Sequence, residues 1–427
     1  MIVTAPLADG YREAVFWTDD APPTERPVAA LPADADVVVV GGGYCGLSAA
    51  TEVAEQGRAA VVLDAEAFGW GASSRNGGMV IPELKVGPAG LEQRYGALGR
   101  ELFAAVNDAF DLVESLVGDG GIACDYERTG QLYLAHHPRV VDHLRHEADE
   151  MSAAGSPARF VARDDLPAEI GSDQYHAGLV LERTGGLQPA RFHAGLVARA
   201  DAAGVALHDR TRATAILPDG AGFRVETSRG TVRAEHVILA TNAYADGLSP
   251  RLRRRTMPVG SYIIATEPLS PEQQAAVNPN RRMFVDTKNF LFYWRLTADG
   301  RMVFGGRRSL SPVTVPEARD FLHGSMVRVH PQLAGVPVTH AWGGYVAITF
   351  DRMPQAGVLD GVHYATGCNG SGVALNTWLG RATARWALGG EPPPFAALKQ
   401  PSIPLWRLRG AYLPVVGQWY RIRDRQP

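Results

Sequence analysis

The chain has 427 residues, of which 46% are hydrophobic and 20% are charged, proportions typical of a folded globular protein and not of a disordered or collagen-like one. Its 42 basic and 45 acidic residues give a formal net charge of −3, so no overall positive field points to nucleic acid as a partner. Cys45, Cys124 and Cys368 form no CxxC pair, which argues against a disulfide framework or a cysteine-built zinc site and predicts a reducing, cytoplasmic compartment.

The first 32 residues predict an irregular N-terminal arm, because four prolines between residues 22 and 32 interrupt any helix. Met1–Gly10 lacks the basic start and apolar core of a signal peptide. No apolar stretch in the chain approaches the ~20 residues needed to span a bilayer. Phe16 and Trp17 are aromatic side chains with which the arm could anchor itself to the body of the protein.

The next segment predicts a complete βαβ unit. Residues 36–40 are an aspartate and four valines, a pattern typical of a strand buried on both faces. Residues 44–56 carry apolar and small side chains at helical spacing, and Gly57 ends this helix. A second apolar strand, 59–63, runs directly into Asp64.

Helices are predicted at 101–117, 140–151, 191–203 and 373–388, and strands at 131–135, 213–216, 223–227, 237–240 and within 261–306. Strand and helix alternate at both ends of the chain, and the middle breaks that rhythm. We therefore expect an α/β protein, α+β overall, in which a Rossmann-like domain is interrupted by a mixed-sheet domain. The expected ranges are 33–85, 180–250 and 340–400 for the nucleotide domain, 86–179 and 251–339 for the second domain, and 401–427 for a C-terminal tail.

Glycines at the end of the first strand form the pattern Gly41-x-Gly43-x-x-Gly46. The first permits a tight turn, the second lets the backbone approach a pyrophosphate, and the third allows close packing of helix on strand. The helix N-terminus then faces the phosphates, and Asp64, roughly 20 residues on, accepts hydrogen bonds from ribose hydroxyls. A turn that merely packs tightly is the alternative interpretation.

Two further glycine-rich loops favour FAD over NAD. Residues 69–79 read GWGASSRNGGM, a run with little side-chain bulk that can lie against a ribityl chain and a flat ring. Residues 367–373 read GCNGSGV and precede the last helix, whose N-terminus would stabilise an anionic reduced flavin. Ordinary surface loops are the alternative for both.

These segments, together with ATNAY at 240–244, PVGSYIIATEP at 258–268, FYWRLTADGRMVFGGR at 292–307 and WGGYVAITFDRMP at 342–354, follow one another in a familiar order. The chain resembles the amine and amino-acid oxidases of the D-amino-acid oxidase superfamily, and most closely the branch that contains gamma-glutamylputrescine oxidoreductase. The resemblance covers residues 35–390.

The resemblance implies binding roles for particular residues. The ADP half of FAD would be held by Gly41, Gly43, Gly46, Asp64 and Ala65. The adenine and the pyrophosphate would be met by Ala213 and Thr241. The ribityl chain and the flavin ring would be lined by Ser73, Arg75, Asn76, Gly77, Gly78 and Met79, and the pyrimidine edge by Gly370, Ser371, Gly372 and Val373.

Departures from the family pattern carry information too. Some relatives attach the flavin through a cysteine where this chain has Gly343-Gly344-Tyr345, so FAD should be noncovalent. Those relatives also place a lysine beside the flavin to assist oxygen, and the nearest equivalent here is Val303. Ser371 stands where many relatives have histidine.

The implied chemistry is oxidation of a C–N bond in a small amine or amino acid. Hydride passes from the alpha carbon to flavin N5, the imine then hydrolyses, and the protein supplies binding, orientation and electrostatics. Tyr262, Tyr293, Trp294 and Arg307 are the candidates for the substrate pocket, because aromatic walls suit amines and arginine suits carboxylates. Core packing or a surface ion pair is the alternative for each.

Three functions remain open on the sequence: an oxidase that uses oxygen, a dehydrogenase that passes electrons to another acceptor, and an FAD-binding subunit without activity of its own. The tail from Pro404 mixes aromatic residues with arginines. One interpretation is a patch that contacts a membrane surface; the interpretation we favour is a tail packed on the FAD domain.

Overall fold

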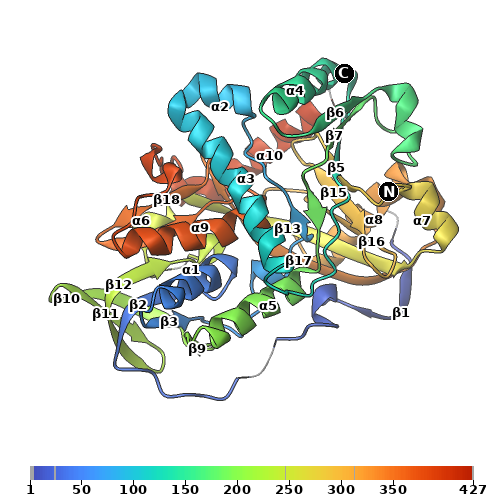
Figure 1. Cartoon of the computed structure of the whole chain (residues 1–427). Coiled ribbons are helices and arrows are strands. Elements are labelled where there is room, and N and C mark those ends of the chain that lie inside the picture. Colours follow the sequence, from blue (N-terminus) through green and yellow to red (C-terminus); the bar gives the residue numbers. More distant parts are fainter. Residues whose placement is uncertain (1–3, 24–25, 246, 312, 426–427) are drawn as a thin grey trace.

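A computed structural model describes residues 4–23, 26–245, 247–311 and 313–425. Two sheets form the frame of the molecule, one of eight strands and one of nine. Figure 1 shows the eight-stranded sheet with its helices at the lower left and the nine-stranded sheet at the right. The mixed α/β architecture expected from the sequence is therefore present.

The predicted βαβ unit is confirmed, and it is the centre of the smaller sheet. Strand β2 (Asp34–Val40) and strand β3 (Ala60–Leu63) pair in parallel, and helix α1 (Tyr44–Glu55) connects them. Val37, Val38 and Val39 are completely buried. A strand flanked on both faces and both edges needs no polar face, and this is why its sequence is an unbroken run of valines.

The rest of the smaller sheet comes from distant parts of the chain. Its order is β10-β11-β12-β2-β3-β9, with β19 beside β12 and β18 beside β19. The strands joining the βαβ unit are β9 (Ala206–His208), β10 (Ala213–Asp219), β11 (Gly222–Thr227), β12 (Gly230–Leu239), β18 (Gln355–Leu359) and β19 (Val362–Thr366).

The larger sheet has the order β1-β17-β13-β16-β15-β14-β5-β7-β6. Its strands are β1 (Leu7–Arg12), β5 (Gln131–Leu134), β6 (Ala158–Val161), β7 (Gly178–Leu181), β13 (Thr256–Pro268), β14 (Met283–Asp286), β15 (Phe292–Leu296), β16 (Arg301–Gly306) and β17 (Val338–Thr349). Strands β4 (Met79–Val80) and β8 (Gly185–Gly186) form a separate two-stranded sheet.

The helices other than α1 are α2 (Pro88–Tyr95), α3 (Ala97–Val117), α4 (Val141–Ala153), α5 (Pro189–Ala202), α6 (Pro250–Arg253), α7 (Pro271–Val277), α8 (Val315–Val329), α9 (Gly372–Ala387) and α10 (Arg409–Arg425). No helix in the described ranges combines the length and the apolar character that a membrane crossing requires.

Two of the expected domain ranges differ from the observed packing. The boundary at 339/340 falls inside β17, which pairs with β13 from Thr256–Thr349 to Thr266–Val338 and so belongs to the larger sheet. Helix α3, placed by the sequence in the second domain, packs its apolar face on α9 in the core of the nucleotide domain. The strands and helices that pair or pack here are far apart in the chain, so the local sequence pattern does not reveal these contacts.

The N-terminal segment is not wholly irregular, contrary to expectation. Its residues 7–12 form β1, which adds to the larger sheet in parallel with β17. Trp17 is 2% exposed in a cluster with Ile263, Val303 and Trp342. The anchoring function expected of this tryptophan is confirmed.

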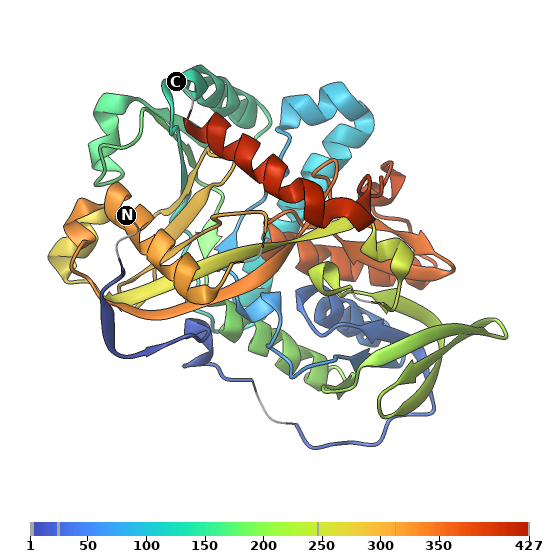
Figure 2. The ribbon, with the colours of Figure 1, turned by 180° about the vertical axis from the view of Figure 1, so that it is seen from behind.

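The C-terminal tail packs on the larger sheet, so the favoured interpretation of a tail packed on the FAD domain is wrong. Leu413 of α10 joins an apolar cluster with Met257 and Val259 of β13. The carboxylate of Asp424 accepts hydrogen bonds from the backbone N–H groups of Asn289 (2.8 Å) and Phe290 (3.0 Å). Figure 2 shows α10, in dark red, lying across this side of the molecule.

Helices α1 and α9 lie against each other at very close range. A Cβ on Gly380 of α9 would be 2.1 Å from the backbone oxygen of Cys45 in α1. Between the same helices, the buried Glu52 carboxylate accepts hydrogen bonds from Arg381 (2.6 Å) and Arg385 (2.7 Å). This pairing aligns the N-termini of the two helices at one place.

Candidate functional site

A cavity of about 440 Å³ lies where the N-termini of α1 and α9 meet the larger sheet. It extends from Asp64 and Ala213 in the smaller sheet to Tyr293 and Arg307 in the larger one. This volume is in the range of ligand-binding pockets. No group of side chains among the described residues is suited to hold a metal ion.

All but two of the predicted cofactor residues lie on the wall of this cavity. These are Gly41, Gly43, Asp64, Ala65, Ser73, Arg75, Asn76, Gly77, Met79, Ala213, Thr241, Gly370, Ser371, Gly372 and Val373. Residues separated by 300 positions in the sequence are thus brought together, and their binding roles remain predictions.

Gly46 and Gly78 do not line the cavity, because both face backbone instead. A Cβ on Gly46 would stand 1.8 Å from the backbone oxygen of Gly41. A Cβ on Gly78, which has φ +71°, would stand 2.0 Å from the backbone oxygen of Leu187. Both positions require glycine because two backbone segments approach closely there. These glycines would therefore affect the bound group only indirectly, through the position of the loops that line the cavity.

The first glycine loop and the Asp64 carboxylate hold each other in place. This carboxylate accepts hydrogen bonds from the backbone N–H groups of Gly42 (2.6 Å) and Glu66 (2.9 Å) at the carboxyl end of β3. Burial raises the pKa of Asp64, and the two hydrogen bonds oppose that rise. The carboxylate thereby faces the cavity from a fixed position, as ribose recognition requires.

His193 supports the same loop and was not predicted. Its Nε2 lies 2.8 Å from the backbone oxygen of Gly42, to which it donates, and burial lowers the pKa of the ring so that it is neutral near pH 7. No motif marks this residue. Only its position on the buried face of α5, against the loop, indicates its function.

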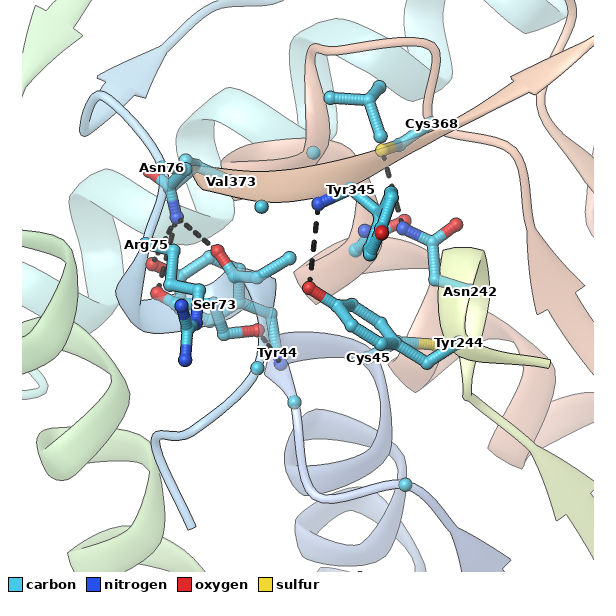
Figure 3. Close-up of a pocket in the computed structure, with 18 of the residues that line it drawn as sticks. Tyr44, Cys45, Ser73, Arg75, Asn76, Asn242, Tyr244, Tyr345, Cys368 and Val373 are labelled. Atoms are coloured by element: carbon cyan, nitrogen blue, oxygen red, sulfur yellow. Dashed lines mark hydrogen bonds between the residues drawn. The ribbon is translucent and has the colours of Figure 1, made fainter. Parts of the chain in front are cut away.

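The second glycine loop meets the first at the start of α1. Gly43 provides no side chain to cap that helix, and the hydroxyl of Ser73 accepts a hydrogen bond from the Tyr44 N–H at 3.0 Å. The Tyr44 hydroxyl in turn accepts a hydrogen bond from Asn76 Nδ2 at 3.2 Å. Figure 3 shows these residues gathered on one side of the cavity, with Asn242 and Cys368 on the other.

Four successive carbonyls of this second loop are held from outside it. Their donors are two tryptophan indoles, an arginine and a backbone N–H: Trp342 Nε1 to Arg75 O (2.8 Å), Trp17 Nε1 to Asn76 O (2.9 Å), Arg295 Nε to Gly77 O (2.8 Å) and Leu187 N to Gly78 O (2.8 Å). We call this set the carbonyl clamp.

The carbonyl clamp turns backbone donors toward the cavity. The C=O and N–H of a trans peptide point in opposite directions, and the described chain has no cis peptide. With the carbonyls of Arg75 and Asn76 directed away, the N–H groups of Asn76 and Gly77 face the cavity, whose wall these two residues form. A flat ring with hydrogen-bond acceptors fits against such a surface.

Arg295 is the central member of the carbonyl clamp, and sequence reasoning missed it. Its guanidinium is buried, also donates to the backbone oxygens of Leu187 (2.5 Å) and Leu296 (3.2 Å), and forms no ion pair among the described residues. Burial lowers the pKa of Arg295 to about 10, so the group stays cationic at neutral pH.

The third glycine loop closes the cavity opposite the clamp. Gly370 has φ +106°, and a Cβ there would meet no atom within 4 Å, because this glycine borders the open cavity. Ser371 precedes α9 and does not cap it. The helix N-terminus therefore directs unpaired N–H groups and a partial positive charge at this wall.

Two of the four substrate-pocket candidates do not line this cavity. The Tyr262 hydroxyl bonds the backbone oxygen of Val313 at 2.7 Å, away from the cavity. Trp294 is 1% exposed, stacks against Phe304 in the core of the larger sheet and donates to His330 Nε2 at 3.0 Å. Side chains alternate along a strand, so their neighbours are the residues that reach the cavity.

The other two candidates, Tyr293 and Arg307, do line the cavity, and Ser261 and Ile263 join them from β13. The hydroxyls of Tyr293 and Ser261 are 3.0 Å apart, and the Tyr293 ring lies over Gly77, where a Cβ would be 3.0 Å from it. This arrangement places an aromatic wall directly beside the carbonyl clamp.

Arg307 has no acidic partner among the described residues. Its Nε is buried without a hydrogen-bond acceptor, and burial lowers the pKa of the guanidinium, with Tyr293 as the neighbour that opposes the shift. The cavity also contains Lys85, but its ammonium is paired with Glu83 at 2.7 Å. Arg307 is thus a cation at the cavity wall that needs an anion.

Comparisons with known proteins agree with this geometry. Residues 36–386 match the model of the family DAO, FAD dependent oxidoreductase. The chain is 33% identical to the probable oxidoreductase OrdL of Rhizobium meliloti, covering 99% of both chains, and 31% identical to gamma-glutamylputrescine oxidoreductase of Escherichia coli, covering 91% of this chain and 93% of that one.

The fold is shared with solved structures of lower identity. Glycine oxidase from Geobacillus kaustophilus superposes with a TM-score of 0.73 at 20% identity, over 87% of this chain and all of that one. L-proline dehydrogenase from P. horikoshii superposes with a TM-score of 0.74 at 19% identity, over 86% and 96%. The cradle of three glycine loops, the near full-length relatives and the family match together show that the chain belongs to the DAO family of FAD-dependent oxidoreductases.

Proposed function

We propose that this enzyme binds FAD noncovalently and oxidises the C–N bond of a small amine that carries a carboxylate. The unpaired Arg307 at the cavity wall is the observation that supports this substrate class. Guanidinium and carboxylate form paired, charge-assisted hydrogen bonds. The relative named gamma-glutamylputrescine oxidoreductase favours the same general class of amine.

The cavity fits FAD on three structural grounds. Gly41 and Gly43 have no side chain to obstruct the approach to the N-terminus of α1, and Asp64 is held by the Gly42 N–H, where its carboxylate would bind a ribose. The N–H groups of Asn76 and Gly77 face the cavity. These residues would hold FAD, which would supply the hydride acceptor for oxidation at the carbon next to the amine nitrogen.

Residues of this chain would bind and orient the substrate and exclude water. Arg307 would bind the carboxylate of the substrate, and the Tyr293 ring would pack against its methylene groups and hold the amine near the clamp. Exclusion of water by Ile263 and the tyrosine would favour the neutral amine that gives up hydride.

The noncovalent mode rests on the residues at the cavity wall. Gly344 and Tyr345 occupy the segment where some relatives carry the attaching cysteine. Cys45 also lines the cavity, but burial raises the pKa of its thiol to about 12, which keeps it protonated and unreactive. All three cysteines are free and buried, consistent with the cytoplasmic location that we propose.

Anaerobic bleaching of the bound flavin tests the proposed function. Purified protein mixed with amines in matched pairs, with and without a carboxylate, should lose its yellow absorbance faster with the carboxylated member. Equal rates for both members would contradict the carboxylate anchor, and no bleaching with any amine would favour a subunit without activity of its own. Comparing peroxide release with dye reduction then shows whether oxygen or another compound accepts the electrons. The comparison is needed because Val303, in a buried apolar cluster, is the nearest equivalent of the lysine that assists oxygen in some relatives.

Arg295→Lys should weaken FAD binding by about tenfold while keeping the charge. Arg295 reaches three separate carbonyls with three different nitrogens, whereas the donors of lysine all lie on one nitrogen, so the loop loses its preorganisation and FAD must order it on binding. The measurement is FAD affinity of the apoprotein by flavin fluorescence. Arg233→Lys, at an exposed arginine paired with Asp34, is the matched control and should change nothing; wild-type affinity in Arg295→Lys would show that the carbonyl clamp is dispensable.

A further inference from the structure

The C-terminal segment has an exposed apolar stripe opposite the face that packs on the larger sheet. Its buried side carries Leu413 and Gly417. The stripe consists of side chains between 46% and 71% exposed: Leu405, Leu408, Val415, Trp419 and Ile422. The last four recur at spacings of seven, four and three residues, which places them on one face of a helix.

This stripe is unusual for the molecule as a whole. Eleven large hydrophobic side chains are exposed in the described structure, and five of them lie between residues 405 and 422. Scattered exposed hydrophobic residues are normal, but a contiguous patch indicates a surface that contacts something. Figure 2 shows that no other element covers α10 on this side.

Positive charge accompanies the stripe. Residues 401–425 contain five arginines, one aspartate and no lysine or glutamate, a net charge of +4 within a chain of net charge −3. The single acid, Asp424, is occupied by backbone N–H groups of Asn289 and Phe290. At helical spacing, Arg407 falls on one flank of the stripe and Arg423 on the other, and the Arg423 guanidinium lies 4.9 Å from the Trp419 ring.

We propose that α10 and the turn before it dock this enzyme on an anionic lipid bilayer, with the helix axis in the plane of the surface. Leu408, Val415 and Trp419 would enter the boundary between headgroups and acyl chains. The arginines on both flanks would lie among the lipid phosphates, the arrangement of interfacial amphipathic helices.

Charge and shape favour this occupant over a second copy of the chain. A two-fold contact through the stripe would bring two segments of net charge +4 together. The stripe is also the outer, convex surface of a single helix, and a fluid bilayer can receive it without a complementary groove. The proposal does not depend on the substrate or on turnover.

Sedimentation of the FAD-loaded protein with lipid vesicles tests this docking. Vesicles of phosphatidylcholine and phosphatidylglycerol should bind the protein about tenfold more tightly than vesicles of phosphatidylcholine alone. The double variant Leu408→Glu/Val415→Glu should lose about tenfold in affinity for the anionic vesicles, because it places carboxylates in the stripe. Arg407→Glu/Arg423→Glu should also weaken binding to them.

Val28→Glu is the matched control, because Val28 is 84% exposed and lies far from this segment in sequence. It should sediment like the wild type, and flavin content and circular dichroism verify folding of every variant. The proposal is overturned if the wild type stays in solution with anionic vesicles, or if the Leu408→Glu/Val415→Glu variant binds them as well as the wild type. A dimer, seen by light scattering and lost in that variant without any lipid binding, would assign the stripe to a second copy.

Discussion

Gly46→Ala should lower the affinity of the protein for FAD by about 100-fold and its stability by about 1–3 kcal/mol. The new Cβ would stand 1.8 Å from the backbone oxygen of Gly41, so α1 must move away from β2. That movement displaces the helix N-terminus and the glycine loop together. FAD affinity of the apoprotein and urea unfolding are the two measurements.

Gly324→Ala is the control for that substitution. Gly324 lies inside α8, where a Cβ would meet no atom within 4 Å, so alanine should leave FAD affinity unchanged and raise stability slightly. Wild-type FAD affinity in Gly46→Ala would mean that the close contact between strand and helix does not position the nucleotide loop.

Arg307→Met should reduce kcat/KM for a carboxylated amine by about 100-fold, the effect of removing a charge-assisted, paired contact from a buried site. The rate for the matching amine without a carboxylate should change little, so the ratio between the two substrates collapses. FAD content should stay at the wild-type level. The measurement is the rate of flavin reduction for both amines, expressed per bound flavin.

Arg308→Met is the neighbouring control, since Arg308 does not line the cavity. Arg307→Lys should recover part of the lost rate, because it keeps a positive charge but not the paired geometry. An equal loss for both amines would assign Arg307 to the structure of the pocket, and a loss below about threefold would exclude it as a carboxylate anchor.

Local backbone chemistry made much of the site predictable. The valine run of β2 can only be a doubly buried strand, and the glycines after it permit a turn against a helix N-terminus. Such signals are contained in a few adjacent residues. Asp64, Ser73 and Gly370, far apart in the chain and all expected to bind one cofactor, do line one cavity.

Strand orientation was not predictable in the larger sheet. Both faces of β15 are buried, so alternation of polar and apolar residues does not reveal which side chain meets the cavity. Tyr293 points to it, and Trp294 points into the core. The same ambiguity applies to β13, where Tyr262 was the candidate but Ser261 lines the cavity.

The carbonyl clamp could not be read from the sequence at all. Trp17, Arg295 and Trp342 act on backbone carbonyls, which every residue has, and they come from three distant segments. A donor at such a position leaves no motif. The surface orientation of α10 was hidden for a related reason, since only its packing on β13 shows which face is left exposed.

By itself, the sequence determined that this protein has a glycine-lined nucleotide cradle and the FAD chemistry of its family, because turns and helix starts depend on neighbouring residues. Only the tertiary structure decided which side chains face the cavity, what holds the second glycine loop and which surface stays uncovered. Those properties depend on how segments hundreds of residues apart pair and pack, and burial alone does not assign a side chain to one face or the other.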